Sequence, residues 1–326
     1  MSKPALTWRS AFQKRRYARG MELVEERLTA VATAYPGELG EACRATLAAG
    51  GKRVRPLLTL LCARRDAALG EPVLRGATAI ELLHMATLVH DDVLDRAELR
   101  RGRPTVAHAY GVQTAVSAGN YLLARAFREL VGAGDPAAVD VLSATAVGLS
   151  EGEVLQRDDA YRVTVTQAEY ELRCERKTAD LFAAACRLGA VLSGAGEQAA
   201  AALSEYGRLS GLAFQVFDDI LDCSGEQADT GKRPGADVRD GTITLPLLFA
   251  LETNAELAPL LSRKGLGAAE VATVLRTVAG SGALERARAV ALGYIEGARR
   301  VLDACPDLVE RELLEQVAAQ VVDRYS

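Results

Sequence analysis

One apolar segment that ends in three aspartates decides the expected fold: residues 77–95 read ATAIELLHMATLVHDDVLD. Its apolar side chains recur at intervals of three and four residues, which is the period of an α-helix. On a helix, Asp91 and Asp95 point the same way and lie about 6 Å apart along the axis, with Asp92 about 100° around it. Taken alone, such a cluster is equally well explained as an acidic cap on the protein surface.

A second copy of the acidic pattern changes that balance. Residues 215–222 read QVFDDILD and repeat the Asp-Asp-apolar-apolar-Asp order of residues 88–95, although the similarity does not extend far enough for an internal repeat. We expect the two motifs to face each other across a helical bundle. Together they would form an oxygen-rich site for Mg²⁺, in which each ion is held by one or two carboxylates and by phosphate oxygens.

The rest of the chain also predicts helices. Segments such as residues 120–131 and 169–192 keep the helical spacing, alanine is abundant, and most of the ten prolines fall in breaks. Neither a strand-turn-strand signal nor a GxGxxG unit is found. The sequence predicts an all-α, single-domain helical bundle over residues 1–326. The largest irregular segment, residues 223–246, is expected to be a functional loop.

Composition describes an ordinary globular protein. The chain has 326 residues, is 49% hydrophobic and 25% charged, and carries a net charge of −4, which argues against a nucleic-acid partner. Its six cysteines include no CxxC pair, which favours reduced, buried thiols in a cytoplasmic protein. No apolar run reaches the roughly 18 residues that a transmembrane segment needs.

The N-terminal segment is basic. Residues 1–20 contain no acidic residue, and a helical pattern follows directly, so we expect a basic helix over about residues 1–30 and not a cleaved transit peptide. Such a helix is compatible with weak contact with an anionic membrane surface.

Basic clusters accompany both acidic motifs. The glycine-led segments GGKRVRP (residues 50–56) and RRGRPT (residues 100–105) are rich in arginine, and further candidates are Lys177 in CERKTADLF and Lys232 in TGKRPGAD. A solvated loop is the ordinary explanation for any single cluster. Arginine and lysine are also the usual partners of phosphate oxygens, and the chain has no P-loop. Their arrangement therefore predicts a phosphorylated ligand bound through Mg²⁺.

The motifs together resemble the trans-isoprenyl diphosphate synthases of the polyprenyl synthetase family, over about residues 50–246. They come in that family's order: GGKRxRP, an E-x-x-H lead-in, DDxxD, RRGxPT, GNYLLA, GExxQ, KTAxLF, FQxxDDxxD and a GK-rich loop that ends in TLP. The resemblance implies a helical bundle of the isoprenoid synthase type around a deep central cavity, normally in a homodimer. It also implies a Mg²⁺-dependent prenyltransferase that condenses an allylic diphosphate with isopentenyl diphosphate, head to tail.

The resemblance also implies roles for single residues. Roughly three Mg²⁺ ions per site would be held by Asp91, Asp92, Asp95, Asp218, Asp219 and Asp222. The allylic diphosphate would be cradled by Arg100, Lys177 and Lys232, and isopentenyl diphosphate would be bound by Lys52, Arg55, His84 and Arg101. The site would further be lined by Gln156, Gln215 and Thr178. One departure is Thr242, where many family members have lysine, and this removes one phosphate contact.

Product length is expected to depend on the residues before the first acidic motif. Ala86 and Thr87 are small and would floor the product cavity, with Leu83 one turn deeper. We therefore predict a product of hexaprenyl length or longer, made from a farnesyl or geranylgeranyl primer; the alternative is a geranylgeranyl or farnesyl diphosphate synthase.

Three other classes of protein are alternatives, and each fits the motifs less well. A class I terpene cyclase typically pairs one Asp-rich motif with an Asn/Ser/Glu-type motif, and head-to-head squalene or phytoene synthases lack GGKRxRP. A non-catalytic subunit of a heteromeric synthase usually loses acidic residues, whereas both motifs are intact here.

Overall fold

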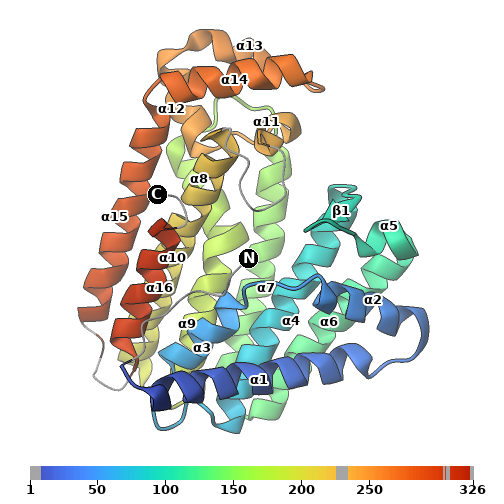
Figure 1. Ribbon diagram of the computed structural model, residues 1–326, viewed down its shortest axis with the longest axis vertical. Helices are drawn as coiled ribbons and strands as arrows, with labels where there is room; N and C mark the ends of the chain where they lie inside the picture. Colours follow the sequence, from blue (N-terminus) through green and yellow to red (C-terminus); the bar gives the residue numbers. More distant parts are fainter. Residues whose placement is uncertain (1–8, 225–233, 304, 306–308, 324–326) are drawn as a thin grey trace. The chain divides into compact units, whose positions relative to one another are not determined.

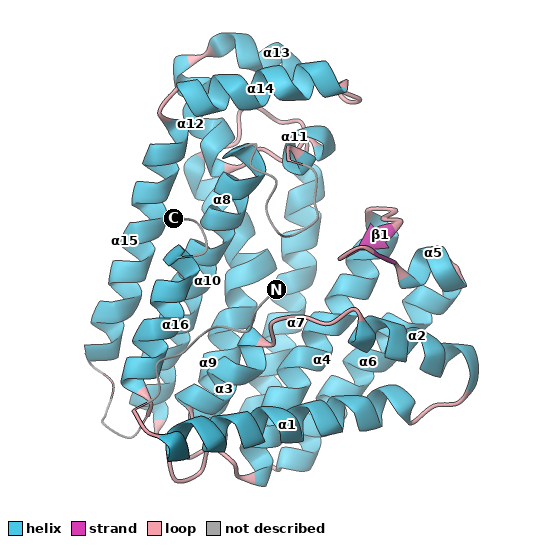
Figure 2. Cartoon of the chain, viewed as in Figure 1, coloured by secondary structure: helices cyan, strands magenta, loops and turns pink. Residues whose placement is uncertain are grey.

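The computed structural model describes residues 9–224, 234–303, 305 and 309–323, and helices make up nearly all of them (Figures 1 and 2). This confirms the all-α prediction. The chain divides into two compact units, and each is described by itself. Unit 1 comprises residues 1–146, 181–207 and 301–317, and unit 2 comprises residues 147–180, 208–300 and 318–326. The single domain over residues 1–326 stays a prediction.

The helices and strands are assigned to the two units as follows. Unit 1 alone holds α1 (Ala11–Thr33), α2 (Gly37–Ala48), α3 (Val54–Cys62), α4 (Glu71–Leu94), β1 (Leu99–Arg100), β2 (Arg103–Pro104), α5 (Val106–Tyr110) and α6 (Val112–Ala133). Helices with residues in both units are α7 (Pro136–Asp158), α9 (Asp180–Leu192), α10 (Glu197–Ser224), α15 (Ala283–Asp303) and α16 (Arg311–Asp323). Unit 2 alone holds α8 (Gln167–Cys174), the π-helix η1 (Glu175–Ala179), α11 (Ala236–Asp240), α12 (Leu245–Thr253), the 3₁₀-helix η2 (Ala255–Leu257), α13 (Ala258–Leu261) and α14 (Ala268–Gly280).

Helix α1 is amphipathic and covers one side of unit 1. It begins after Ser10, whose hydroxyl accepts a hydrogen bond from the backbone N–H of Gln13 at 3.1 Å. Tyr17, Val24 and Leu28 recur at helical spacing and are almost completely buried. The basic helix expected over about residues 1–30 is therefore observed as α1; residues 1–8 lie outside the described part of the chain.

Helix α4 is the central helix of unit 1. Residues 76–83 are buried without interruption, so this part of the helix has apolar neighbours on all sides. It packs against α1, α3 and α6. A buried helix of 24 residues holds that motif, at its C-terminal end, on a rigid support.

Unit 2 is built around α10 and α12. Phe217 on α10 and Leu245 and Leu247 on α12 are fully buried. Helix α12 packs against α8 and α14, and α15 contributes Ala287 and Ile295 to the core. The second acidic motif thus also stands on a helix with a buried apolar face.

Three features differ from the sequence-based expectations. A two-stranded hairpin, β1–β2, joins α4 to α5, although no strand-turn-strand signal was found. The predicted irregular segment 223–246 contains α11, while residues 225–233 lie outside the described part. A π-helix, η1, interrupts the helical run between α8 and α9.

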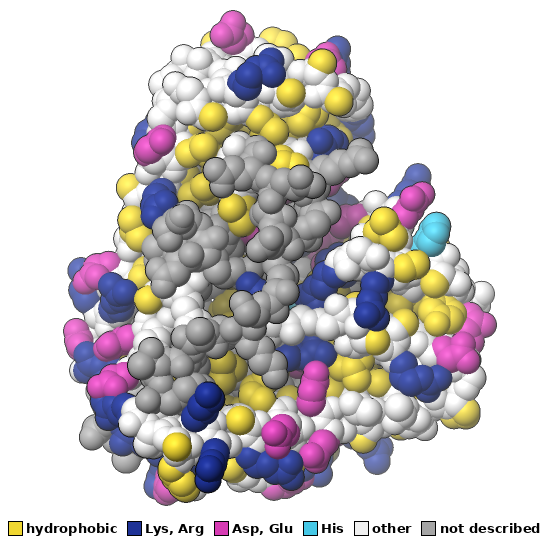
Figure 3. All heavy atoms as spheres, viewed as in Figure 1, with side chains coloured by type: hydrophobic (Ala, Val, Ile, Leu, Met, Phe, Trp, Pro, Cys, Tyr) yellow, Lys and Arg dark blue, Asp and Glu magenta, His cyan; other side chains and the backbone are white. Residues whose placement is uncertain are grey.

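Other observations agree with the sequence. All six cysteines are free, and five of them are buried, as predicted. Among the described residues, we find no helix with the length and apolar character of a membrane span. In the space-filling view, cationic and anionic side chains are intermixed over the face that is shown (Figure 3).

Candidate active site

The first acidic motif lies at the C-terminal end of α4, which ends at Leu94. Asp91 is half-buried, Asp95 is exposed, and Asp92 is 4% exposed. Asp92 accepts a hydrogen bond from Arg100 Nε at 2.7 Å. Burial raises the pKa of the Asp92 carboxyl, and the Arg100 guanidinium counteracts this increase. Within this motif, Asp91 and Asp95 are thus the more accessible carboxylates, and Asp92 is part of an ion pair.

The RRGRPT segment forms a tight hairpin. Arg100 and Arg103 pair across it, and the two turn residues, Arg101 and Gly102, have φ of 53° and 73°. Positive φ at both central positions is the geometry of a type I′ turn, which glycine adopts without strain. Thr105 then begins α5, because its hydroxyl accepts from the backbone N–H of His108 at 3.1 Å. This hairpin therefore holds Arg100 and Arg101 beside the first acidic motif.

Two arginines of the GGKRVRP segment, Arg53 and Arg55, make different kinds of contact. Arg53 has a left-handed backbone, with φ of 52°, and its guanidinium binds Glu81 at 2.9 Å and also contacts Glu25. Arg55 stacks over the Phe182 ring at 4.7 Å. Burial lowers the pKa of Arg55 to about 10. Its Nε is among the buried polar atoms of the described residues that lack a hydrogen-bond partner, which is costly unless an anion binds nearby.

These segments enclose a pocket within unit 1. Its charged lining includes Asp92, Glu81 and three arginines, which are Arg53, Arg100 and Arg101. His84 also lines the pocket, whereas Lys52 and Arg55 are not among its lining residues. Arg101 also donates to the carbonyl oxygen of Gly50, and this bond joins the hairpin to the GGKRVRP segment.

The surroundings of His84 favour its neutral form. Burial lowers the pKa of His84 well below its usual range, and the neighbouring Arg55 and Arg101 lower it further. At neutral pH the imidazole is therefore uncharged, and it can offer one N–H to an anion while the arginines supply the charge.

A glycine in α6 makes room for the histidine next to the first motif. A Cβ placed on Gly119 would lie 2.2 Å from His90 Nε2, so only glycine lets the imidazole pack against this helix. The glycine of the GNYLLA motif thereby leaves space for the side chain that directly precedes Asp91.

The three carboxylates of the second acidic motif, on α10, differ in exposure and in hydrogen-bond partners. Asp218 is exposed, whereas Asp219 is 3% exposed and accepts hydrogen bonds from Tyr170 at 2.7 Å and Gln215 at 2.8 Å. Burial raises the pKa of Asp219 to about 7, while the two hydrogen bonds oppose that increase. Asp222 is turned to the start of α11. Its two oxygens accept from the backbone N–H groups of residues 236 and 237 at 3.0 and 2.9 Å.

The KTAxLF motif coincides with the π-helix. Such one-turn π-helical interruptions occur frequently at functional sites. Lys177 binds Glu153 of the GExxQ motif at 2.7 Å, and Thr178 donates to Gln215 Oε1 at 2.7 Å. Gln156 is half-buried one turn after Glu153. Unit 2 therefore brings Thr178 and Gln215 together with Asp219, and Lys177 directly precedes Thr178 in the chain.

Other sequence-predicted residues are placed as follows. Lys232 lies outside the described residues. Thr242 is half-buried, and its backbone N–H donates to Asp237 O at 2.9 Å. Ala86 and Leu83 are buried, and Thr87 donates to His84 O at 2.9 Å. None of these three lines the pocket in unit 1.

Sequence reasoning missed three residues that hold the site's side chains in place. Glu81 binds Arg53, Glu153 binds Lys177, and Tyr170 binds Asp219. The first two belong to motifs that were recognised, E-x-x-H and GExxQ, but their partners are 28 and 24 residues away. For Tyr170 the sequence offers no signal.

The donor set fits Mg²⁺. Each motif presents carboxylate oxygens, which are the hard ligands that this ion prefers. Among the described residues, no three candidate ligand side chains already converge on one point. Mg²⁺ is usually held by only one or two carboxylates, with phosphate oxygens and water completing its shell.

Comparison with known proteins gives a consistent answer. Residues 36–278 match the family described as polyprenyl synthetase. The chain is 40% identical to heptaprenyl diphosphate synthase component 2 of Geobacillus stearothermophilus, over 92% of this chain and 94% of that protein. It is 38% identical to geranylgeranyl diphosphate synthase of Methanosarcina mazei, over 89% of this chain and 90% of that protein.

A solved structure agrees with these relatives. Heptaprenyl diphosphate synthase of Staphylococcus aureus superposes with a TM-score of 0.90 at 30% identity, covering 95% of this chain and 99% of that one. The order of motifs, the helical fold and these similarities together show that the chain belongs to the polyprenyl synthetase family.

Proposed function

We propose that this chain is a Mg²⁺-dependent prenyltransferase that condenses an allylic prenyl diphosphate with isopentenyl diphosphate, head to tail. One observation carries the proposal: the arginine-lined pocket of unit 1 ends on Asp92, so that cations suited to diphosphate adjoin the carboxylates of the first acidic motif. Diphosphate chemistry needs both, because a diphosphate becomes a good leaving group only when its negative charge is neutralised.

The residues divide the work according to their surroundings. The accessible carboxylates, Asp91, Asp95 and Asp218, would hold Mg²⁺, which supplies charge neutralisation to the allylic diphosphate. Arg100 and Lys177 would contact the same diphosphate. Each is held in the structure by an acidic partner, Asp92 and Glu153, at 2.7 Å. The isopentenyl diphosphate would occupy the pocket with Arg101 and neutral His84.

The proposed reaction needs no nucleophilic side chain. The allylic C–O bond breaks and its electron pair leaves with the diphosphate. The π-electrons of isopentenyl diphosphate then form the new C–C bond, and a proton passes to the released diphosphate. The chain's task is to bind, to orient and to exclude water from the allylic cation.

The direct test is incubation of the purified chain with isopentenyl diphosphate, farnesyl diphosphate and Mg²⁺, followed by mass analysis of the prenyl products. We expect turnover by this chain alone, with a product of hexaprenyl length or longer, and its loss on chelation of Mg²⁺. The relative named component 2 raises the alternative of a heteromeric synthase. Turnover that requires a second chain would favour that alternative, and light scattering of the active sample tests the proposed homodimer.

Product length offers a second test, at Ala86. This residue is 1% exposed and precedes Asp91 by five positions on α4. If it floors the product cavity, Ala86→Phe shortens the main product by at least one isoprene unit, because the ring fills space that the growing chain needs.

The control for this test is Ala79→Phe, two turns earlier on α4, where the side chain is also fully buried. Mass analysis of products from both variants, with melting temperatures to check folding, measures the difference. An unchanged product in a folded Ala86→Phe variant would show that the floor lies elsewhere.

A further inference from the structure

We propose that Tyr170 is a positioning residue of the second acidic motif. Its hydroxyl fixes the orientation of the Asp219 carboxylate, and this in turn holds the motif in the conformation that binds a metal–diphosphate ligand. The inference rests on the proposed function for its ligand, and it concerns residues of unit 2 alone.

Two hydrogen bonds, one to each oxygen, hold the Asp219 carboxylate in a single orientation. Tyr170 Oη donates to Oδ2 at 2.7 Å, and Gln215 Nε2 donates to Oδ1 at 2.8 Å. Asp219 and Tyr170 are 3% and 1% exposed, so neither oxygen has water as a ready substitute for its donor. A buried carboxylate that loses a donor bears the cost of an unsatisfied polar group, and it rotates or takes up a proton to reduce that cost.

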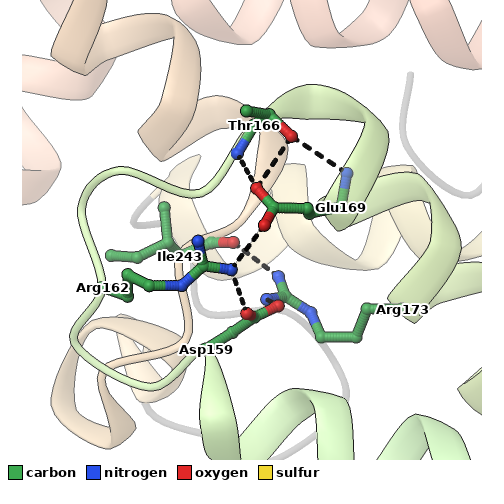
Figure 4. Close-up of polar contacts among 6 residues, drawn as sticks. All are labelled: Asp159, Arg162, Thr166, Glu169, Arg173 and Ile243. Carbon is green, nitrogen blue, oxygen red and sulfur yellow. Dashed lines mark hydrogen bonds and ion pairs between the residues drawn. The ribbon is translucent and has the colours of Figure 1, made fainter.

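Tyr170 is itself held rigidly, by Arg173. The Arg173 guanidinium lies 5.6 Å from the centre of the Tyr170 ring, and its side chain is 4% exposed. Figure 4 shows its other contacts: it donates to Asp159 Oδ2 at 3.0 Å and to the carbonyl oxygen of Ile243 at 2.6 Å. One side chain thereby ties α8 to the end of α7 and to the segment before α12.

The start of α8 is fixed by the same network. Arg162 bridges Asp159 and Glu169, and Glu169 completes a capping box with Thr166, the N-cap of α8 (Figure 4). The buried ion pair Arg173–Asp159 and this capping box hold α8 at two points. Tyr170 lies between these two points in the sequence. Its hydroxyl is therefore held in place toward Asp219 by a helix that is already fixed at both ends.

On its other side, Asp219 is linked to the π-helix. Gln215 donates to Asp219 and accepts from Thr178, whose neighbour Lys177 is a proposed diphosphate contact. Asp218, the exposed carboxylate of this motif, directly precedes Asp219 on α10. Loss of the Tyr170 hydroxyl would thus loosen the metal-binding and the diphosphate-binding groups of unit 2 together.

The experiment compares Tyr170→Phe with wild type in binding Mn²⁺ plus inorganic diphosphate, followed by electron paramagnetic resonance of the free Mn²⁺. The phenyl ring keeps the buried volume and the contact with Arg173 and removes only the donor. We expect the dissociation constant to rise at least fivefold. In turnover assays we expect kcat to fall and the half-saturating Mg²⁺ concentration to rise, with KM for isopentenyl diphosphate unchanged.

The matched control is Tyr294→Phe, which removes a half-buried tyrosine hydroxyl elsewhere in unit 2, beside Glu171 on α8. It should bind the probe like wild type. Equal affinity of Tyr170→Phe and Tyr294→Phe would overturn the inference and leave the proposed function standing. A wild-type chain that binds no Mn²⁺ with diphosphate would contradict the proposed metal site itself.

A second variant keeps the inference testable if Tyr170→Phe does not fold. Asp159→Asn keeps the shape of the Arg173 partner and removes its charge, so it weakens the support of Tyr170 without touching the hydroxyl. A rise in the dissociation constant smaller than that expected of Tyr170→Phe, but at least twofold, supports the positioning role. Wild-type affinity in a folded Asp159→Asn variant contradicts it.

Discussion

Replacing Asp91 with alanine is expected to lower kcat/KM by about 10²–10³, the largest effect on catalysis that we anticipate for a single substitution. Asp91 lies on the last turn of α4, one turn before Asp95, which is the C-cap of that helix. In the proposed mechanism, removing its carboxylate would take away a Mg²⁺ ligand that the transition state needs more than the bound substrate does, because charge on the leaving diphosphate increases as the C–O bond breaks. We therefore expect kcat to fall and the half-saturating Mg²⁺ concentration to rise.

The control is Asp66→Ala, which removes another aspartate of unit 1. Asp66 has a side chain that is 69% exposed and pairs with Arg64, two residues away. Its removal should leave kcat/KM within a factor of two, since exposed ion pairs contribute little. Steady-state kinetics at several Mg²⁺ concentrations, with circular dichroism to confirm folding, compares the two variants. A loss of less than tenfold in Asp91→Ala would contradict the metal role of the first motif.

Much of the fold could be predicted because helices are local. The spacing of apolar residues in 77–95 depends on neighbours within one or two turns, and α4 forms where that spacing predicts it. The hairpin at residues 99–104 escaped prediction because its strands have two residues each, too few for any alternation to appear. Its signal is the Arg101–Gly102 turn, which in the sequence stands out only as part of a basic segment.

The site was predicted in its residue types but not in its pairings. The acidic motifs and basic clusters were visible in the sequence, whereas the ion pairs Arg53–Glu81 and Lys177–Glu153 join residues more than 20 positions apart. Burial also distinguishes carboxylates that look alike in sequence. Asp218 is exposed and Asp219 is buried, although they are adjacent and belong to one motif. Only packing against Tyr170 reveals that difference.

The π-helix leads to the second large expected effect, which is steric. Gly152 on α7 faces η1 so closely that an added Cβ would lie 2.7 Å from the backbone nitrogen of Lys177 and 2.9 Å from the carbonyl carbon of Arg176. Both are backbone atoms, which cannot turn aside as a side chain can. Gly152→Ala must therefore push α7 and η1 apart, and we expect it to destabilise the fold by about 1–3 kcal/mol.

The same displacement should affect substrate binding. Lys177 stands on η1 and its partner Glu153 directly follows Gly152, so separating the two helices lengthens the 2.7 Å contact between their charged groups. We expect KM for the allylic diphosphate to rise at least tenfold, whereas KM for isopentenyl diphosphate, whose proposed contacts lie in unit 1, stays within a factor of two. A merely destabilised enzyme would not show this selectivity.

Gly148, one turn earlier on α7, provides the matched control. A Cβ there would also be close to a neighbour, at 2.6 Å, but that neighbour is the Oδ2 atom of Asp180, the far end of a movable side chain. Gly148→Ala should change stability by no more than about 0.5 kcal/mol and leave both KM values unaltered. Thermal melts and steady-state kinetics of the two variants decide the matter. If both behave alike, the close approach of α7 to η1 is not what positions Lys177, and the glycine of the GExxQ motif requires another explanation.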